Sequence, residues 1–401
     1  TENFQINMSL SLEGIGAELL NEDDFTKVVR VIPGGPADMQ GILKAEDRIV
    51  GVGQDQQPII DVIGWRIDEV VRLIRGPKDS IVRLQLLPAN SEATTVISII
   101  RDKVKLEERS AQKSILEVSS DSQIFRIGVI EIPAFYMDFE AYKSRDPDYR
   151  STSRDVFRLL RELSEENIHG IILDLRNNSG GSLTEAIQLT DLFIETGPAV
   201  QIRDFKKRIT PVQKATRRSV YRGPLMVMIN RLSASATEIF AGALQDYGRA
   251  FIVGSQSFGK GTVQNVTELT SGALKMTISK FYRVSGDSTQ NLGVIPDIEF
   301  PSEFDPEKIG ESHKENALPW DRISAASYSG TDQLNGLLEP LKLKHRLRIR
   351  EEADYVHMVA QIELSKKWQT DDLVSLNLDK RKARLKSWDE KVLDLENKRR
   401  K

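Results

Sequence analysis

The sequence of 401 residues contains no cysteine, only four histidines and no long hydrophobic run. Without cysteine it has no disulfide bond, no cysteine-based metal site and no cysteine nucleophile. No apolar run approaches the roughly 18–20 residues of a transmembrane span, and the N-terminal stretch is not a signal peptide. Because the sequence enters a folded motif almost at once, we expect that a leader has been removed or omitted. A net charge of −3 gives no reason to expect nucleic acid as the main partner.

The patterns of apolar and charged residues along the sequence predict three domains. Residues 9–92 combine short apolar runs with one amphipathic helix, in which Ile67, Val70, Val71 and Ile74 share a face before a Gly-Pro stop. Residues 93–302 open with an alternating strand (94–106) and then alternate strands and helices, which favours an α/β core with parallel pairing. Residues 303–401 are rich in charged helix formers and end in a basic stretch, which we interpret as a solvated helical face.

The expected elements of the second domain can be given by residue range. The predicted strands are 126–132, 170–175, 224–229 and 250–253, and the predicted helices are 154–166, 183–194 and 235–246.

Several catalytic patterns are weak or absent. There is no G-x-S-x-G elbow for a Ser-His-Asp triad, and no H-E-x-x-H pattern for a catalytic zinc. Residues 254–260 match G-x-x-x-x-G-K, but Gly261 stands where a P-loop needs Ser or Thr, and β-branched residues follow instead of a helix. A nucleotide hydrolase is therefore a distant third interpretation.

Two segments remain as candidates for chemistry. Ser233 and Ser235 lie where a predicted buried strand is followed by a predicted helix. Each of them has two possible roles: it caps the helix, or it is a nucleophile at the positive end of the helix dipole. The turn at 177–181 is rich in asparagine and glycine and presents N–H groups that suit an oxyanion, although an ordinary loop has the same composition.

These segments together resemble the C-terminal processing, or tail-specific, peptidase family. The resemblance rests on the Gly-Gly turn at 177–181, on 233–239 (SASATEI), on 258–264 (FGKGTVQ), on 280–283 (KFYR) and on 293–297 (GVIPD). It covers roughly residues 9–300 and continues into the helical extension of the long periplasmic branch of Gram-negative bacteria. Thr237 departs from the serine common there, and the N-terminal helices of that branch are missing.

The resemblance implies a catalytic set of Ser235, Lys260 and Gln264, with the N–H groups of Gly181 and Ala236 as the oxyanion hole. The chemistry is consistent with these roles. Serine needs an adjacent base, and lysine serves as one only when desolvation lowers its pKa. We expect Gln264 to hold Lys260 through its amide oxygen.

The N-terminal module resembles a PDZ domain, which binds peptides as an added strand. Gly14, Ile15, Gly16 and Ala17 correspond to the loop that receives a terminal carboxylate, and Ile67 and Val71 belong to the helix that lines the groove. The same helix face is also suited to core packing, and both uses are compatible.

We therefore predict an α/β peptidase core of the crotonase/ClpP-like type, with a PDZ domain and a helical C-terminal extension. The predicted function is a serine endopeptidase that selects proteins with apolar C-termini and uses no metal or other cofactor. The family implies a periplasmic role in protein quality control and in turnover of cell-envelope and murein enzymes. A lipoprotein adaptor and peripheral membrane association stay open, and the alternative is an inactive PDZ adaptor on a peptidase fold.

Overall fold

The computed structural model describes residues 2–89, 91–120, 123–213, 218–331, 333–370 and 373–400. The chain divides into two compact units: the first comprises residues 1–110 and 138–150, and the second comprises residues 111–137 and 151–401. Residues 138–150 thus belong to the first unit, although the residues before and after them in the sequence belong to the second. The three domain boundaries predicted from the sequence stay predictions.

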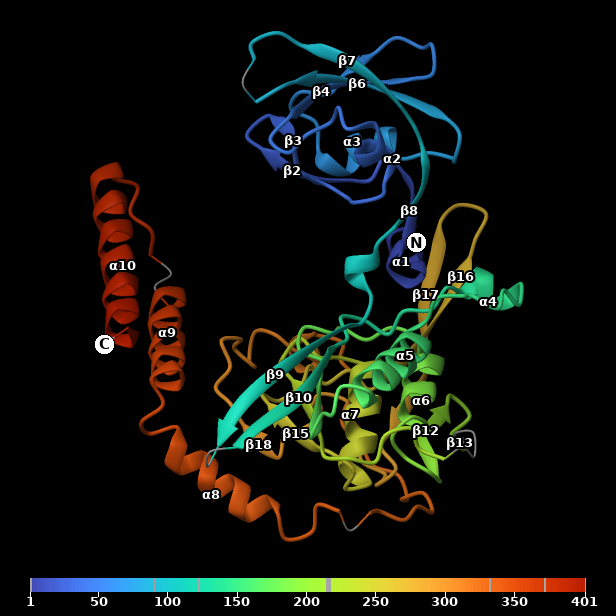
Figure 1. The fold of residues 1–401 in the computed structure, drawn as a ribbon, viewed down its shortest axis with the longest axis vertical. Helices are drawn as coiled ribbons and strands as arrows, with labels where there is room; N and C mark the ends of the chain where they lie inside the picture. The colour runs from blue at the N-terminus through green and yellow to red at the C-terminus, as the bar shows by residue number, and fades with distance from the viewer. Residues whose placement is uncertain are drawn as a thin grey trace. The chain divides into compact units, whose positions relative to one another are not determined.

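The first unit is built on an antiparallel sheet in the order β2-β3-β4-β6-β7, to which β5 adds (Figure 1). A separate antiparallel pair joins β1 to β8, with Ser11 opposite Lys105 and Gly14 opposite Asp102. The strands are β1 (Ser11–Gly14), β2 (Ala17–Glu22), β3 (Phe25–Val31), β4 (Arg48–Gln54), β5 (Ile60–Asp61), β6 (Ile81–Leu87), β7 (Thr95–Ile100) and β8 (Asp102–Lys105). The helices are α1 (Glu2–Ser9), α2 (Pro36–Gln40), α3 (Ile67–Ile74) and α4 (Phe139–Lys143).

The predicted helix of the first unit packs its apolar face on the sheet. Val70 and Ile74 of α3 are buried in one cluster with strand residues such as Val28, Ile49 and Leu84. Two of the four residues on the face expected from the i, i+3, i+4, i+7 spacing therefore belong to the core of this unit, and the other two, Ile67 and Val71, are only partly buried.

The strand expected at residues 94–106 is interrupted at Arg101. Its side chain is only 2% exposed and turns inward beneath the end of α3. The guanidinium donates to the carbonyl oxygens of Ile74 (2.8 Å) and Leu73 (3.0 Å), and also to Ser80 Oγ and Gln54 Oε1. Because the last carbonyls of a helix lack partners within it, this buried cation satisfies the C-terminal end of α3.

The second unit contains the α/β core. Strands β10, β11, β14, β15 and β18 run parallel in the sheet order β18-β15-β14-β11-β10-β9, and β9 is antiparallel at one edge. Helices α5, α6 and α7 contribute most of their buried residues to the same hydrophobic cluster as this sheet. The alternation of strands and helices in the sequence predicted this layer correctly.

A second, antiparallel sheet in the order β13-β12-β17-β16 completes the core. The strands of the second unit are β9 (Gln112–Ser120), β10 (Gln123–Glu131), β11 (Gly170–Asp174), β12 (Pro198–Asp204), β13 (Ile209–Gln213), β14 (Leu225–Ile229), β15 (Phe251–Gly254), β16 (Thr262–Glu268), β17 (Ala273–Tyr282) and β18 (Ile298–Glu299). The helices are α5 (Thr152–Ser164), α6 (Leu183–Thr190), α7 (Ala236–Asp246), α8 (Leu338–Arg348), α9 (Ala353–Gln369) and α10 (Leu378–Arg399).

All three predicted helix ranges of the second domain differ from the observed ones, and α5 begins and ends two residues earlier than predicted, at Thr152–Ser164. Helix α6 ends at Thr190 rather than at residue 194, and the Thr190 hydroxyl donates to the Ala186 carbonyl oxygen, a bond that competes with the helical ladder. Helix α7 begins at Ala236, so that Ser235 lies just before it.

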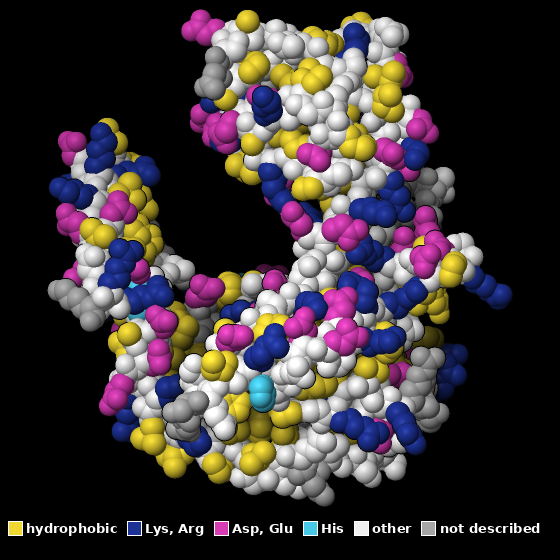
Figure 2. All heavy atoms as spheres, viewed as in Figure 1, with side chains coloured by type: hydrophobic (Ala, Val, Ile, Leu, Met, Phe, Trp, Pro, Cys, Tyr) yellow, Lys and Arg dark blue, Asp and Glu magenta, His cyan; other side chains and the backbone are white. Residues whose placement is uncertain are grey.

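The C-terminal region is helical, as predicted. Helices α9 and α10 lie side by side, with the rings of Trp368 and Trp388 4.6 Å apart between centroids (Figure 1). Hydrophobic side chains remain exposed on this pair among charged ones, including Leu385 and Leu393 of α10 (Figure 2). Among the described residues, no helix has the length and hydropathy needed to cross a membrane.

Replacement of Arg101 by alanine should lower the free energy of unfolding of the first unit by about 1–3 kcal/mol, because it removes the side-chain donor to the buried Ile74 carbonyl oxygen. The Leu73 carbonyl oxygen, by contrast, keeps its bond from Gln54 Nε2. Urea denaturation measures this loss, and hydrogen exchange in α3 localises it. Arg72→Ala on the exposed face of α3 is the matched control, with a change within about 0.5 kcal/mol. Equal stability of the two variants would contradict a role for Arg101 in holding α3.

Candidate active site

Ser235 occupies a strained turn between β14 and α7. Its φ is +60° and its ψ is −112°, a conformation that costs a non-glycine residue about 1–3 kcal/mol. Three hydrogen bonds hold it: its N–H donates to Glu238 Oε2 (2.7 Å), and its carbonyl oxygen accepts from the N–H groups of Glu238 (2.9 Å) and Ile239 (3.0 Å). The side chain is half-buried at the N-terminus of α7.

The neighbouring Ser233 is a structural residue. It is fully buried, and its hydroxyl donates to the Leu175 carbonyl oxygen (2.8 Å) and accepts from the Asn230 N–H (2.9 Å). Its oxygen is therefore committed to the turn, whereas Ser235 lies partly open to solvent. Of the two serines that the sequence left as candidates, only Ser235 is accessible to a substrate.

The glycine-rich turn after β11 lies directly against Ser235. The Asn178 carbonyl oxygen accepts from Ala234 N–H (3.0 Å) and from Thr237 Oγ1 (2.9 Å). Gly180 has a φ of +104°, and a Cβ at this position would lie 2.9 Å from Ser235 Cβ. Only glycine permits both this backbone conformation and this contact.

Two backbone N–H groups remain unpaired at this contact. Phe135 binds the turn from the other side, through its N–H to the Gly180 carbonyl oxygen (2.9 Å) and its carbonyl oxygen to the Ser182 N–H (2.8 Å). Within the described ranges, no hydrogen bond uses the N–H of Gly181 or of Ala236. Unpaired donors beside a serine at a helix N-terminus can stabilise an oxyanion.

Lys260 lies in the loop between β15 and β16 and is half-buried. Its Nζ donates to Gln264 Oε1 at 3.1 Å, the contact expected from the sequence, although Gln264 itself is exposed. Within the described part of the chain, no hydrogen bond joins the Lys260 amine to the Ser235 hydroxyl. A strand, β16, follows this loop from Thr262, where a P-loop would continue into a helix. The G-x-x-x-x-G-K pattern therefore has no helix N-terminus to bind phosphate.

The surroundings of Lys260 favour its neutral form. Burial lowers the pKa of Lys260, and the positive charge of Lys275 lowers it further, as does that of Lys314. The carboxylates of Glu311 and Glu238 act in the opposite direction and raise this pKa. The net shift is downward, as a lysine that accepts a proton requires.

Glu238 joins the two candidate residues through their backbones. Its side chain is fully buried, and Oε2 accepts from the N–H groups of both Ser235 (2.7 Å) and Lys260 (2.9 Å). Oε1 accepts from Ser257 Oγ (2.6 Å) and from the Gly259 N–H (2.7 Å). Desolvation raises the pKa of Glu238 to about 7, although these four bonds favour the carboxylate.

Sequence reasoning assigned no role to Glu238. The available signal was the S-x-x-E spacing from Ser235 to Glu238, which is a capping-box pattern. The bonds from Glu238 to the loop of Lys260 could not be read from that spacing, because they join residues more than 20 positions apart.

The first unit contains a cavity of about 530 Å³ at the predicted carboxylate loop. Gly14, Ile15, Gly16, Ala17 and Val71 line it, whereas Ile67 does not. Within the described residues, the N–H groups of Ile15 and Gly16 make no hydrogen bond, so they are available to a ligand. The sequence did not predict that α1 and residues 105–109 also line this cavity.

No group of three or more His, Asp or Glu side chains in the described ranges is placed to hold a metal ion. The candidate site is therefore composed of a serine, an amine, an amide, a buried carboxylate and backbone N–H groups. That set is suited to acyl transfer through a covalent serine intermediate.

Family models match nearly the whole chain in three parts. Residues 126–300 match peptidase family S41, residues 3–87 match the PDZ domain, and residues 304–401 match the C-terminal domain of tail specific protease.

Individual relatives agree with these matches. The tail-specific protease of Haemophilus influenzae is 40% identical over 394 residues, covering 95% of this chain and 54% of that protein. The carboxy-terminal processing protease CtpA of Bacillus subtilis is 29% identical over 369 residues, covering 91% of this chain and 72% of that protein. A crystal structure of the PDZ domain of a carboxy-terminal protease from Vibrio cholerae with a peptide is 49% identical, covering 24% of this chain and all of that chain, with a TM-score of 0.24.

The chain thus spans about half the length of the Haemophilus influenzae relative. The serine, the lysine and the glycine-rich turn all lie within the matched peptidase segment. The carboxylate loop lies within the segment that carries the PDZ match, whereas residues 105–109, which also line its cavity, lie outside it. This chain belongs to peptidase family S41, with a PDZ domain and a tail-specific protease C-terminal domain.

Proposed function

We propose that this chain is a serine endopeptidase in which Ser235 is the nucleophile and Lys260 the general base. The observation that carries the proposal is the shared bonding of one buried carboxylate, Glu238, to the backbones of both residues. That bonding joins the backbones of the two loops, which supports a single site formed by the serine and the lysine. The lowered pKa of Lys260 supports its role as a base.

The proposed reaction proceeds in two steps. Neutral Lys260 takes the proton of the Ser235 hydroxyl as its oxygen attacks the substrate carbonyl carbon, and the carbonyl oxygen becomes an oxyanion. The N–H groups of Gly181 and Ala236 donate to that oxyanion. Lysine then gives its proton to the leaving amine, which leaves an acyl ester on Ser235, and water hydrolyses the ester by the same proton route.

In this mechanism Gln264 orients the amine. Its Oε1 accepts one N–H of Lys260, which directs the lone pair of the neutral amine away from Gln264. An amide oxygen carries no full charge, so it stabilises the ammonium form less than a carboxylate would.

We further propose that the cavity of the first unit receives apolar C-termini of substrates. The free N–H groups of Ile15 and Gly16 suit a terminal carboxylate, and apolar residues such as Val71 suit the last side chains. The relative from Haemophilus influenzae is a tail-specific protease of a bacterium, which supports a bacterial setting. The proposed location is the periplasm, and the proposed task is quality control and turnover of cell-envelope and murein enzymes.

Ser235→Ala should reduce cleavage of an apolar-tailed protein on the order of 10⁴-fold or more, because the attacking oxygen is lost. Gel-based cleavage and thermal melting measure activity and folding. Ser233→Ala is the matched control: it should cost about 1–3 kcal/mol of stability through its buried hydroxyl yet keep cleavage when folded. If a folded Ser235→Ala chain cleaves at the rate of the unmodified chain, Ser235 is not the nucleophile. Tail binding without cleavage by the unmodified chain would indicate an adaptor instead.

Lys260→Ala should lower kcat/KM by about 10²–10⁴-fold, since the proton acceptor is lost. Lys260→Arg should not restore activity, because a guanidinium stays protonated. In the unmodified chain, kcat/KM should fall as pH drops through the lowered pKa of Lys260, since only the neutral amine accepts a proton. Full activity in the Lys260→Arg variant would rule out Lys260 as the general base. Inhibition of the unmodified chain by EDTA would indicate a metal-dependent mechanism instead.

An acidic pair at the end of a substrate peptide should weaken its binding by about 5–150-fold, which corresponds to about 1–3 kcal/mol for one apolar anchor. Fluorescence anisotropy with the Ser235→Ala chain measures this without cleavage. Val71→Asn should weaken binding of the apolar-tailed peptide. Val29→Asn, at an exposed position outside the cavity, should leave that binding unchanged. Equal affinity for apolar and acidic tails would reject tail selection by this cavity.

A further inference from the structure

Residues 305–331, here called the connecting segment, run from β18 towards α8. They belong to the part of the chain that matches the C-terminal domain of tail specific protease, outside the S41 match. This segment has almost no regular structure, yet it contacts the loops of both Ser235 and Lys260. Four sets of contacts carry the inference.

The first contact is made by Arg231, four residues before Ser235 and 3% exposed. Its guanidinium donates to the carbonyl oxygens of Ile309 (2.6 Å) and Pro306 (3.2 Å) in the connecting segment. It also donates to the carbonyl oxygen of Ser257 (2.6 Å), in the loop of Lys260. One buried cation therefore ties the segment to both sides of the candidate site.

The second contact surrounds Phe258, two residues before Lys260. Glu311 donates its N–H to the Phe258 carbonyl oxygen at 3.0 Å, and the Lys314 amine lies 5.5 Å from the centre of the Phe258 ring. The two charged side chains pair at 2.7 Å. Glu311 is 7% exposed, so a buried negative charge and a half-exposed positive charge meet beside the lysine loop.

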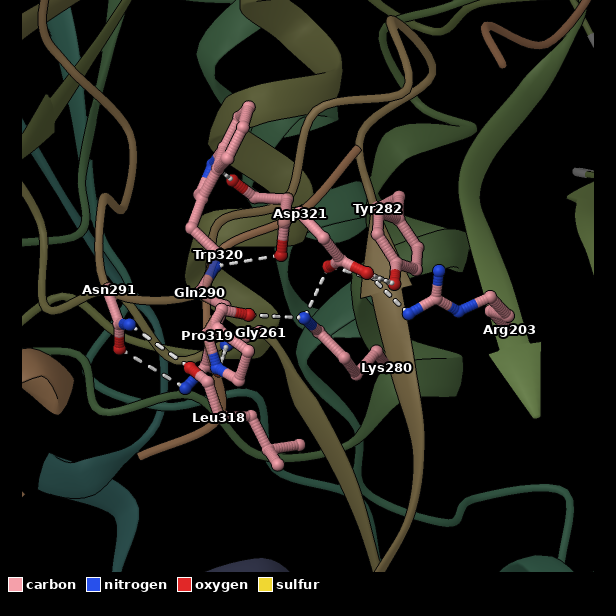
Figure 3. A network of polar contacts seen from close by, with 11 residues as sticks. Arg203, Gly261, Lys280, Tyr282, Gln290, Asn291, Leu318, Pro319, Trp320 and Asp321 are labelled. Carbon is pink, nitrogen blue, oxygen red and sulfur yellow. Dashed lines mark hydrogen bonds and ion pairs between the residues drawn. The ribbon is translucent and has the colours of Figure 1, made fainter. Parts of the chain in front are cut away.

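The third contact reaches the glycines on either side of Lys260. The Gly259 carbonyl oxygen accepts from Asn291 N–H (2.7 Å). The Gly261 N–H donates to Gln290 Oε1 (2.9 Å; Figure 3). The Asn291 side chain in turn donates to the carbonyl oxygen of Leu318 in the connecting segment (3.0 Å). A Cβ on either glycine would come within 3 Å of this turn, so the packing is close.

The fourth contact fixes the strand beside β16. Asp321 of the connecting segment pairs with Lys280, which is 8% exposed, and with Arg203 at 2.5 Å, and it accepts from the Tyr282 hydroxyl at 3.1 Å (Figure 3). Lys280 lies opposite Thr262, the first residue of β16. The segment therefore holds the strand pair that begins two residues after Lys260.

We propose that the connecting segment is a working part of the peptidase site and that its Glu311 and Lys314 are positioning residues for Lys260. The proposal rests on the proposed function, in which Lys260 is the base. It assigns to the start of the C-terminal domain a direct part in preparing the lysine, beyond attachment of the helices that follow.

The charged groups that face Lys260 come from three elements. Lys275 lies on β17, Glu238 lies on α7, and Glu311 and Lys314 lie on the connecting segment. Lys275 and Lys314 lower the pKa of Lys260 and add to the effect of burial, whereas Glu311 and Glu238 raise it. The connecting segment therefore supplies one charge of each sign to the lysine.

Single substitutions in the segment should move the acid limb of kcat/KM in opposite directions. Lys314→Gln removes a positive charge, raises the pKa of Lys260 and moves the limb to higher pH. Glu311→Gln removes a negative charge, lowers that pKa and moves the limb to lower pH. At a pH on the acid limb, we expect roughly a twofold to tenfold loss for the first and a similar gain for the second, from a screened unit charge at this range.

Two exposed residues of the same segment provide matched controls. Lys308→Gln and Glu307→Gln make the same charge changes at positions that do not act on Lys260. Both should leave the pH profile unchanged, and thermal melting confirms folding of all four variants. A shift of equal size in the controls would overturn the proposal, since net charge alone would then explain the result.

A second measurement follows the lysine itself. Burial raises the pKa of Glu238 to about 7, so its carboxyl group also contributes to the pH profile and an amine-specific readout is needed. In the Ser235→Ala background, acetic anhydride labels neutral amines, and mass spectrometry of the peptide with Lys260 gives its labelling rate against pH. Opposite displacements of this curve in Lys314→Gln and Glu311→Gln are expected, and coincident curves would overturn the proposal.

The two measurements separate this proposal from the proposed function. If Lys260→Ala still cleaves substrate, Lys260 is not the base, and the labelling curves nevertheless test the action of the segment on its amine. If Lys260→Ala is inactive and the labelling curves coincide, the base assignment stands and the role of Glu311 and Lys314 is rejected.

Discussion

The site depends on the carboxylate of Glu238, a single buried group that accepts four hydrogen bonds. Two of its donors belong to the serine and lysine themselves, and the other two belong to Ser257 and Gly259 in the loop before Lys260. No neutral side chain can replace it: a glutamine offers one oxygen, and its amide nitrogen would face backbone N–H groups. The cost is a buried charge, which appears as the raised pKa of Glu238. In return, the buried carboxylate holds the loops of Ser235 and Lys260, which are distant in the sequence, in fixed positions.

Most of the remaining framework of the site is made of backbone groups. The glycine-rich turn, Phe135 and the serine turn exchange main-chain hydrogen bonds, and Asn178 and Asn230 add side-chain bonds between the same loops. Backbone bonds on either side hold the N–H groups of Gly181 and Ala236 in place and leave both donors unpaired among the described residues. The proposed oxyanion hole requires donors of this kind.

Much of this could be predicted from the sequence, where the signal was local. The hydrophobic spacing of α3 predicted its buried face, and the alternation of strands and helices predicted the parallel sheet. The motifs around Ser235 and Lys260 identified the two loops that the structure brings together. Their catalytic roles remain predictions, which the experiments above address.

The features that the sequence did not reveal depend on contacts between distant residues. Arg101 interrupts a strand because its side chain satisfies the end of α3, and no spacing rule encodes that bond. The walls that α1 and residues 105–109 add to the cavity, and the connecting segment, are likewise irregular or short. Their conformations follow from partners elsewhere in the chain, such as Arg231 for residues 306–309, and not from periodicity.

The strained backbone of Ser235 has a consequence for how this protein balances stability against activity. A glycine at this position would adopt the positive φ without penalty, so the residue best suited to the turn is not the one found there. Stability alone would favour glycine, which could not form the acyl ester of the proposed mechanism. The retention of serine there has an energetic cost that the fold meets elsewhere, through the buried carboxylate and the capped turn beneath it. Under the proposed mechanism, the most stable version of this turn is therefore an inactive one.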